Sequence, residues 1–255
     1  MIPCLTSVAR NLYSIKHYMK PSGMIRIRCC PGKTGAGAKQ GEVVILLHGL
    51  CRTYRSMQKM AKALVSAGYT VVNVGYPSRT ASIQELAAAV MKEILFLPEV
   101  MDAQAIHFVT HSLGGMLVRQ YLKTQTIQKL GRVVMLGPPN QGSQVVDALG
   151  WLKIFQWMHG PAGNQLGTHI HAFPRNLGPV YFPLGIIAGD RSINWINSCM
   201  IDGTDDGKVS VEQTKVDGMT GHIVIHTAHP YLMRNNKVIA QTIQFLRKGH
   251  FQYAE

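Results

Sequence analysis

The fold is decided by the stretch Ile106-His107-Phe108-Val109-Thr110-His111-Ser112-Leu113-Gly114-Gly115. Its apolar part is typical of a buried strand that ends at Thr110, and a helical pattern begins just after Ser112. A serine at such a strand-to-helix turn lies in a strained elbow that exposes its hydroxyl. Gly114 and Gly115 let the new helix pass close to neighbouring strands. These features predict that Ser112 is a nucleophile, and the alternative is a serine that only caps the helix.

Short apolar runs alternate with longer helical patterns on both sides of this stretch. Near-continuous Val/Ile/Leu runs separated by helices indicate a mostly parallel sheet with helices on both faces, an α/β fold. Residues 150–183 interrupt the alternation and are interpreted as a small lid-like insertion. Strands are expected at 43–47, 69–74, 105–110, 132–136, 184–188 and 223–227, with an edge strand at 24–29. Helices are expected at 54–67, 83–96, 113–124 and 234–247.

The composition is that of one large folded domain or two small ones. Of 255 residues, 46% are hydrophobic and 15% are charged, which argues against disorder. A chain of this length buries roughly 70–75% of its unfolded surface, so its stability needs neither a metal nor a disulfide. The apolar runs are far shorter than the ~20 residues of a transmembrane helix. The odd number of cysteines, five, predicts free thiols and a cytoplasmic location, and no metal site is expected.

The residues around Ser112 resemble those of α/β-hydrolases of the lipase and esterase branch, in which His-Ser-x-Gly-Gly surrounds the nucleophile. Bacterial lipases and GPI inositol-deacylase-like hydrolases share this pattern, and the resemblance covers about residues 42–248. The sequence departs from the pattern at Thr110, where G-x-S-x-G has its first glycine. The resemblance implies an α/β-hydrolase domain over 42–255 and a hydrolytic serine.

The oxyanion-binding groups are also implied by the resemblance. His48-Gly49-Leu50 follows the apolar run 43–47, and the family has an H-G loop after its third strand. The backbone N–H groups of Leu50 and Leu113 would then bind the oxyanion, with Gly49 permitting the required backbone geometry. The alternative is an ordinary turn at the end of a strand. His48 is expected to be a structural part of this loop.

The base is expected in the loop beyond the last strand, because the family's chain order is Ser, then Asp or Glu, then His. His226 lies near the end of that strand and His229 lies just past it. His229 is followed by Pro230 and then by the closing helix, as in the family. We therefore predict His229 as the base, with His226 as the second candidate, while His250 belongs to the tail.

The acid is predicted from the stretch Gly203-Thr204-Asp205-Asp206-Gly207-Lys208-Val209-Ser210. It resembles the N/D-D-G-x-V-S stretch of related lipases, in which the Asp before Gly is the acid. Asp206 is the choice on this ground. Asp190, at the end of a predicted strand, and Asp205 remain alternatives, and an Asp-Asp-Gly sequence can also be a simple turn.

The predicted activity is hydrolysis of carboxylic esters through an acyl-enzyme, without a metal or organic cofactor. The apolar stretch 151–158 is either a lid or acyl-chain pocket, which implies a lipid-like substrate, or a helix buried on the sheet. An acyltransferase, in which an alcohol replaces water, is the alternative enzyme. A non-catalytic binding protein with the same fold is the third hypothesis.

The positive charge is concentrated near the N-terminus. The chain has 26 Lys and Arg against 13 Asp and Glu, a formal charge of +13. Residues 1–41 hold seven of the basic residues and no acidic one, and are taken as a separate basic segment. Apolar residues at every third or fourth position of 1–20 predict an amphipathic helix. It would dock on its own domain or, alternatively, contact an anionic membrane. Nucleic-acid binding is not expected, because no helix-turn-helix or aromatic-interleaved patch accompanies the charge.

Overall fold

A computed structural model describes residues 14–20, 23–33 and 41–252 of the chain. Within these residues, eight strands form one sheet in the order β1-β2-β4-β3-β5-β6-β7-β8. The six strands from β3 to β8 run parallel, whereas β2 is antiparallel to both β1 and β4. The strands are β1 (Ser14–Lys20), β2 (Gly23–Cys30), β3 (Glu42–Leu47), β4 (Thr70–Gly75), β5 (Ala105–His111), β6 (Leu130–Leu136), β7 (Leu184–Gly189) and β8 (Gly221–Ile225).

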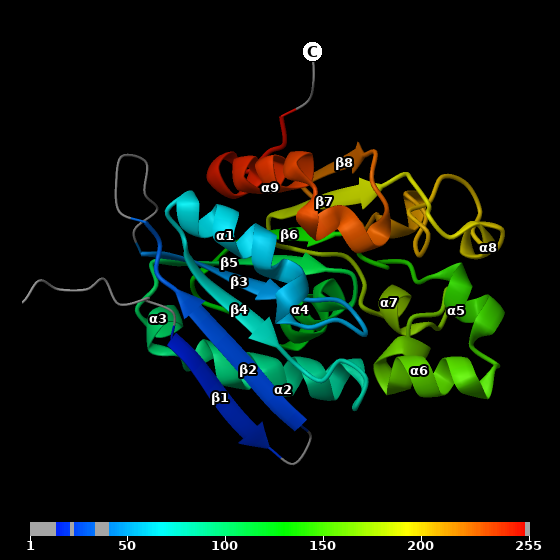
Figure 1. Cartoon of the computed structure of the whole chain (residues 1–255), viewed down its shortest axis with the longest axis horizontal. Helices are drawn as coiled ribbons and strands as arrows, with labels where there is room; N and C mark the ends of the chain where they lie inside the picture. Colours follow the sequence, from blue (N-terminus) through cyan, green and yellow to red (C-terminus); the bar gives the residue numbers. More distant parts are fainter. Residues whose placement is uncertain (1–13, 21–22, 34–40, 253–255) are drawn as a thin grey trace, which may run out of the picture.

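Helices cover both faces of the sheet, as the sequence predicts (Figure 1). One face carries α2 and α4, the other carries α1 and α9, and α5 to α8 lie beyond the carboxyl ends of the strands. The helices are α1 (Gln58–Ser66), α2 (Ile83–Leu95), α3 (Pro98–Met101), α4 (Leu113–Thr124), α5 (Gln144–Leu149), α6 (Lys153–Asn164), α7 (Phe173–Asn176), α8 (Trp195–Ser198) and α9 (Asn236–Lys248). Three 3-10 turns are η1 (Tyr54–Met57), η2 (Glu212–Thr214) and η3 (His229–Arg234).

The core consists of two apolar layers, one on each face of the sheet. Successive side chains of a strand point to opposite faces, and β3 shows this directly. Ile45 and Leu47 pack in the layer under α2 and α4, whereas Val44 and Leu46 pack in the layer under α1 and α9. Each fully buried side chain of this kind contributes on the order of 1.5–3 kcal/mol to folding. Because both faces are covered, the central strands are apolar at nearly every position.

The predicted helix at 54–67 forms as two pieces, η1 followed by α1. Thr53 has extended backbone angles, and its hydroxyl oxygen accepts a hydrogen bond from the Arg55 amide. This cap starts a 3-10 turn before the regular helix begins at Gln58.

The amphipathic helix predicted over residues 1–20 is wrong for the part that the structure describes. Ser14–Lys20 is a strand that pairs antiparallel with β2 from Ser14↔Cys29 to Lys20↔Gly23. The open edge of β2 offers unpaired N–H and C=O groups, and a strand at residues 14–20 forms hydrogen bonds with them. A short isolated helix would leave these groups unpaired and is itself only marginally stable in water. The rest of the predicted helix, residues 1–13, lies outside the described residues. The alternative of a contact with an anionic membrane depended on this helix, and nothing in the described residues supports it.

The sheet also extends across the boundary expected at residue 41. β2 pairs with β4 over Arg26↔Gly75 to Cys30↔Val71, and Ile25 and Ile27 are buried in the core. The strand expected at 24–29 is therefore present as Gly23–Cys30, with β1 outside it.

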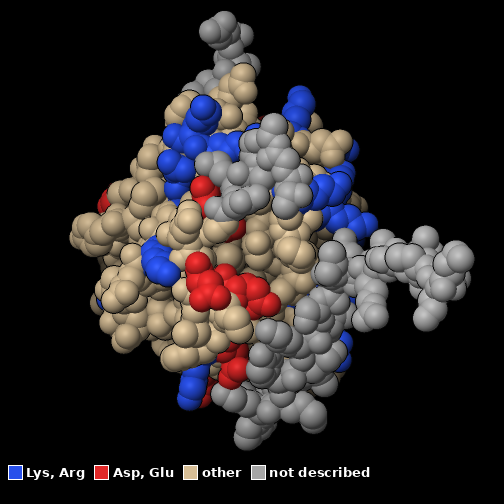
Figure 2. Space-filling model, turned by 90° about the vertical axis from the view of Figure 1, so that its left-hand side faces the viewer, with Lys and Arg blue, Asp and Glu red and all other residues tan. Residues whose placement is uncertain are grey.

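Charge is unevenly distributed over the surface. Asp and Glu side chains gather on the side of the molecule that is at the left in Figure 1, with Lys and Arg side chains around them (Figure 2). This is the end at which β3 and β5 begin, opposite the carboxyl ends of the parallel strands. None of the helices in the described part of the chain combines the length and hydropathy that a transmembrane span requires.

Candidate active site

Ser112 occupies a strained turn between β5 and α4. Its backbone angles are φ 51° and ψ −119°, in a region that costs a non-glycine residue on the order of 1–3 kcal/mol. The turn is held by hydrogen bonds from the Ser112 amide to the Leu136 carbonyl (2.9 Å) and from the Gly115 amide to the Ser112 carbonyl (3.0 Å). A Cβ at Gly114 would lie 2.6 Å from the Leu47 carbonyl oxygen, so this position requires glycine. The predicted elbow is therefore present.

Thr110 fits the elbow because Gly115, which lies against it, has no side chain. Thr110 is fully buried, and a Cβ at Gly115 would lie 3.3 Å from its hydroxyl oxygen. Among the described residues this hydroxyl has no hydrogen-bond partner, a cost of about 1–3 kcal/mol for a buried polar group. The departure from the family's first glycine is thus accommodated locally.

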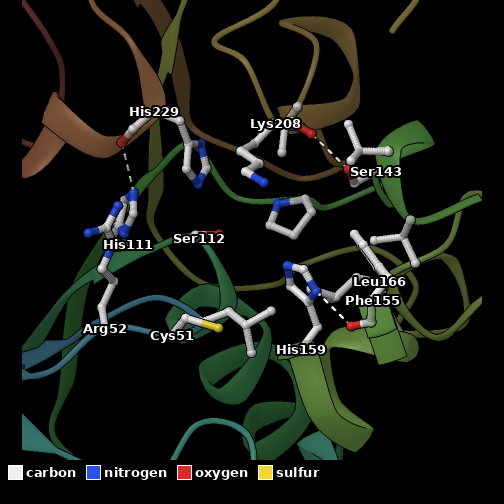
Figure 3. Close-up of a pocket in the computed structure, with 15 residues that line it drawn as sticks. Cys51, Arg52, His111, Ser112, Ser143, Phe155, His159, Leu166, Lys208 and His229 are labelled. Atoms are coloured by element: carbon white, nitrogen blue, oxygen red, sulfur yellow. Dashed lines mark hydrogen bonds between the residues drawn. The ribbon is translucent and has the colours of Figure 1, made fainter. Parts of the chain in front are cut away.

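His229 and Asp206 form a buried pair beside the elbow. The Nδ1 of His229 lies 2.7 Å from Oδ2 of Asp206, and the two side chains are 10% and 0% exposed. The other carboxylate oxygen, Oδ1, accepts hydrogen bonds from the amides of Lys208 and Val209, both at 3.0 Å. Because the carboxylate accepts the proton on Nδ1, the Nε2 of His229 is left as an acceptor. The ring points toward Ser112, which lines the same cavity (Figure 3).

The two rival residues for the acid and the base pair with each other, away from the cavity. The Nδ1 of His226 lies 2.9 Å from Oδ1 of Asp190, and neither residue lines the cavity that contains Ser112. Asp205 does not pair with a histidine. Its carboxylate accepts hydrogen bonds from the Gly207 amide (2.6 Å) and the Ser198 hydroxyl (2.9 Å). His250 contacts the carbonyl of Phe251 in the C-terminal tail.

The loop after β3 approaches the elbow closely. A Cβ at Gly49 would lie 2.7 Å from Nδ1 of His111 and 3.2 Å from Cβ of Ser112, so only glycine permits this approach. Leu50 lines the cavity, and Leu113 is the first residue of α4. Within the described residues, no hydrogen bond engages the amide of either leucine. Two backbone donors are thus available near Ser112.

His48 has the structural role that the sequence predicts. Its ring stacks on Tyr76 with centroids 4.1 Å apart. Its Nδ1 donates to the Gly49 carbonyl (2.8 Å), and its Nε2 accepts from the Tyr76 amide (3.2 Å). Burial lowers the pKa of His48 to about 4, so the ring is neutral near pH 7. The ring fixes the loop that carries Leu50.

His111 is a site residue that sequence reasoning did not single out. Its Nε2 donates to the backbone carbonyl of His229 (3.1 Å), and the two rings lie 4.7 Å apart. Burial, and then the nearby charge of a protonated His229, hold the pKa of His111 well below its usual value. The His111 ring is therefore neutral, and it joins the elbow to the loop that carries His229. Its place directly before Ser112 was the available signal.

The cavity has a volume of about 350 Å³ and a largely apolar wall (Figure 3). Its lining residues are Leu50, Cys51, Arg52, His111, Ser112, Pro139, Ser143, Val145, Val146, Phe155, His159, Leu166, Lys208, Val209 and His229. Sequence reasoning also missed Arg52, His159 and Lys208, because a contact across loops leaves no local pattern.

The apolar stretch 151–158 contributes to this wall through α6. Phe155 is buried in the cavity wall, whereas Trp157 is 78% exposed. The helix is broken at Gly160, where φ is 65° and a Cβ would lie 2.0 Å from the Arg79 carbonyl oxygen. The segment 151–158 is therefore not a fully buried helix, and its movement as a lid stays a prediction.

Solved structures share this fold at low sequence identity. The mature lipase of Bacillus licheniformis superimposes with a TM-score of 0.65 at 18% identity, covering 86% of this chain and 97% of that one. An esterase of Pyrococcus furiosus superimposes with a TM-score of 0.58 at 15% identity, and the match covers 92% of each chain. A carboxylesterase of Bacillus subtilis superimposes with a TM-score of 0.53 at 14% identity, and the match covers 94% of this chain and 93% of that one. The chain therefore has the α/β-hydrolase fold.

No protein-family model and no curated protein sequence matches the chain. Within the described residues, no group of three or more His, Cys, Asp and Glu side chains is arranged to hold a metal ion. Structural similarity at this identity establishes the fold, and the activity has to be argued from the site.

Proposed function

We propose that this protein is a serine hydrolase that cleaves carboxylic esters, with Ser112 as nucleophile, His229 as base and Asp206 as the acid that orients the base. The observation that carries the proposal is the buried His229–Asp206 pair, 2.7 Å apart, beside a serine in a strained elbow. Of the described histidines that follow Ser112 and pair with a carboxylate, His229 alone also lines the cavity of Ser112. The fold shared with a lipase, an esterase and a carboxylesterase supports the same activity.

In the first half of the proposed reaction, Oγ of Ser112 attacks the ester carbonyl carbon while its proton passes to Nε2 of His229. The carbonyl electron pair moves onto oxygen, and the amides of Leu50 and Leu113 bind that oxyanion. When the tetrahedral intermediate collapses, the alcohol leaves with the proton from His229 and Ser112 carries the acyl group. Asp206 keeps the tautomer of His229 fixed and stabilises the imidazolium.

In the second half, water attacks the acyl-enzyme while His229 removes its proton. Collapse releases the carboxylic acid and returns the proton to Ser112. Every atom in this sequence comes from the ester, one water molecule and the three side chains. We accordingly propose no cofactor.

The proposed substrate is an ester with an apolar portion. Val145, Val146 and Phe155 form an apolar wall near Ser112 that can take an acyl chain. The exposed tryptophans on and beside α6, Trp151 and Trp157, add apolar surface and favour lipid-like esters. A closer relation to GPI inositol-deacylase-like hydrolases stays a prediction from the sequence.

The proposal is tested with p-nitrophenyl esters from acetate to decanoate. We expect the wild-type protein to hydrolyse them and Ser112→Ala to lower kcat/KM by about 10⁴-fold or more. Ser66→Ala, at the exposed end of α1, is the matched control and should keep full activity. Thermal unfolding of each variant verifies folding. A folded wild-type protein without ester turnover, or turnover that survives in Ser112→Ala, would contradict the proposal.

A further inference from the structure

The side chain of Lys208 enters the cavity from the loop that carries Asp206. Its backbone is held on both sides, because its amide donates to Oδ1 of Asp206 (3.0 Å) and its carbonyl accepts from the Ser143 hydroxyl (2.7 Å). Gly207, at φ 94°, makes the turn that permits this arrangement. The ammonium group points into the cavity between His229 and Ser143 (Figure 3). The direction of this side chain is thus built into the loop.

The Lys208 ammonium has no hydrogen-bond or ion-pair partner among the described residues. The carboxylate whose charge acts on it is that of Asp206, whose two oxygens already bind His229 and two backbone amides. The Lys208 side chain is exposed to solvent, although burial of part of it against the protein lowers its pKa below the usual value. An exposed ammonium stays hydrated without a counter-ion, and one that points into a cavity can form a charge-assisted hydrogen bond with an anionic group of a bound ligand.

The rest of the cavity adds positive charge and no negative charge. Arg52 also lines it, and none of its fifteen lining residues, all within the described part of the chain, is Asp or Glu. The acidic side chains visible in Figure 2 gather at the opposite end of the molecule. Charges of one sign in a concave, partly apolar site concentrate ligands of the other sign. The charged side chains that line the cavity are therefore cationic, which favours an anionic ligand.

We propose that the cavity selects esters that also carry an anionic group, a carboxylate or a phosphate, which binds the Lys208 ammonium with Arg52 nearby. The inference rests on the proposed ester hydrolysis and adds the substrate class. The apolar wall of Val145, Val146 and Phe155 would take the hydrocarbon portion, so the substrate is an amphiphilic anion. Because the Lys208 side chain is exposed, salt screens such an ion pair, so the discrimination should fall as the salt concentration rises.

The first test compares two esters of equal length, mono-p-nitrophenyl glutarate and p-nitrophenyl valerate, which differ by a terminal carboxylate. The readout is the ratio of their kcat/KM values within each variant. We expect this ratio to fall about tenfold or more in Lys208→Met, which removes the charge and keeps all but the last atom of the unbranched side chain. Lys208→Arg should restore most of the ratio. Lys153→Met, on the exposed face of α6, should keep the wild-type ratio.

The second test measures binding without turnover, by calorimetry with hexyl phosphate and with hexanoate. Both anions should bind the wild-type protein at low salt and bind Lys208→Met at least tenfold more weakly, and the tighter of the two identifies the anionic group. If esters are hydrolysed but neither the ratio nor the binding depends on Lys208, the anion inference is wrong and the hydrolase proposal stands. If the anions bind through Lys208 but no ester is hydrolysed, the hydrolase proposal is wrong and the anion site remains.

Discussion

Two His–Asp pairs lie close together in this molecule, and their surroundings differ sharply. His226 and His229 both follow β8, and their partners Asp190 and Asp206 both follow β7. The pairs have similar lengths, 2.9 Å and 2.7 Å. The side chains of the first pair are 73% and 30% exposed, whereas those of the second are 10% and 0% exposed. The same chemical groups are thus exposed to solvent in the first pair and buried in the second.

The difference in exposure supports the proposal that the surroundings, and not the pairing itself, make a His–Asp pair suitable for catalysis. An exposed pair is screened by water and contributes about 0–1 kcal/mol. The buried carboxylate of Asp206 also accepts two backbone amides, which fixes its orientation. Gly189 makes the buried pair possible, because a Cβ there would lie 2.3 Å from the Thr227 carbonyl oxygen and 2.9 Å from Cβ of Asp206. The missing side chain lets the two loops meet.

The largest contrast is expected between His229→Ala and His226→Ala. Removal of His229 takes away the proposed base, so kcat should fall about 10⁴-fold or more, with ester binding less affected. The measurement is steady-state hydrolysis of a p-nitrophenyl ester at pH 7. Equal losses in the two variants would show that the two pairs do not differ in role.

Asp206→Asn is expected to have the next largest effect. The asparagine keeps the size of the side chain, but its neutral amide neither stabilises the imidazolium nor fixes the tautomer of His229. We expect kcat to fall about 10³–10⁴-fold. Activity is measured alongside thermal unfolding, because the two amides bound to Oδ1 also depend on this carboxylate. A folded variant with near wild-type kcat would remove Asp206 from the proposed mechanism.

Burial of the site histidines should also appear in the pH dependence of stability. The pKa of His48 is about 4 in the folded state and about 6.5 when unfolded, so the unfolded state binds more protons between these values. Stability from this group is complete above pH 6.5 and is lost as the pH falls toward 4. We expect His48 to account for a loss of roughly 2 kcal/mol between pH 7 and pH 5.

Urea unfolding at both pH values checks this loss in the wild-type protein and in His48→Gln, which cannot titrate. The slope of stability against pH should be smaller in the variant. His226→Gln is run alongside as the exposed counterpart. An identical slope in the wild-type protein and His48→Gln would contradict the buried, neutral state of His48.

The smallest effect is expected from Asp190→Asn. Loss of this exposed His–Asp contact should change kcat/KM by less than about twofold and the free energy of unfolding by less than about 1 kcal/mol. Ester hydrolysis and urea unfolding measure the two quantities. A large loss of activity with normal stability would move Asp190 into the mechanism.

The sequence predicts the elements whose signals are local. The strand–serine–helix pattern around Ser112 and the buried strands of the parallel sheet are present with boundaries shifted by one or two residues. Residues 14–20 were predicted as a helix because apolar spacing over a short window does not distinguish a helix from a strand that pairs with a distant partner. The pairing energy comes from β2, which the local pattern does not contain.

The site was predicted less completely than the fold. The choice between Asp206 and Asp190 depended on a resemblance, because both follow β7 and only the path of the chain around Gly189 places one beside His229. Lys208 carried no signal of its own, since its direction depends on the turn at Gly207. Side chains that meet across loops are determined by tertiary structure.

The roles of Ser112 and His229 are tested most directly by the reaction of the purified protein with a fluorophosphonate, with the modified residue mapped by mass spectrometry. We expect an adduct on Ser112 that is absent in Ser112→Ala, strongly slowed in His229→Ala and formed at the wild-type rate in His226→Ala. Labelling that is equally fast in wild-type and His229→Ala, or no labelling of a folded wild-type protein with or without added detergent, would contradict it.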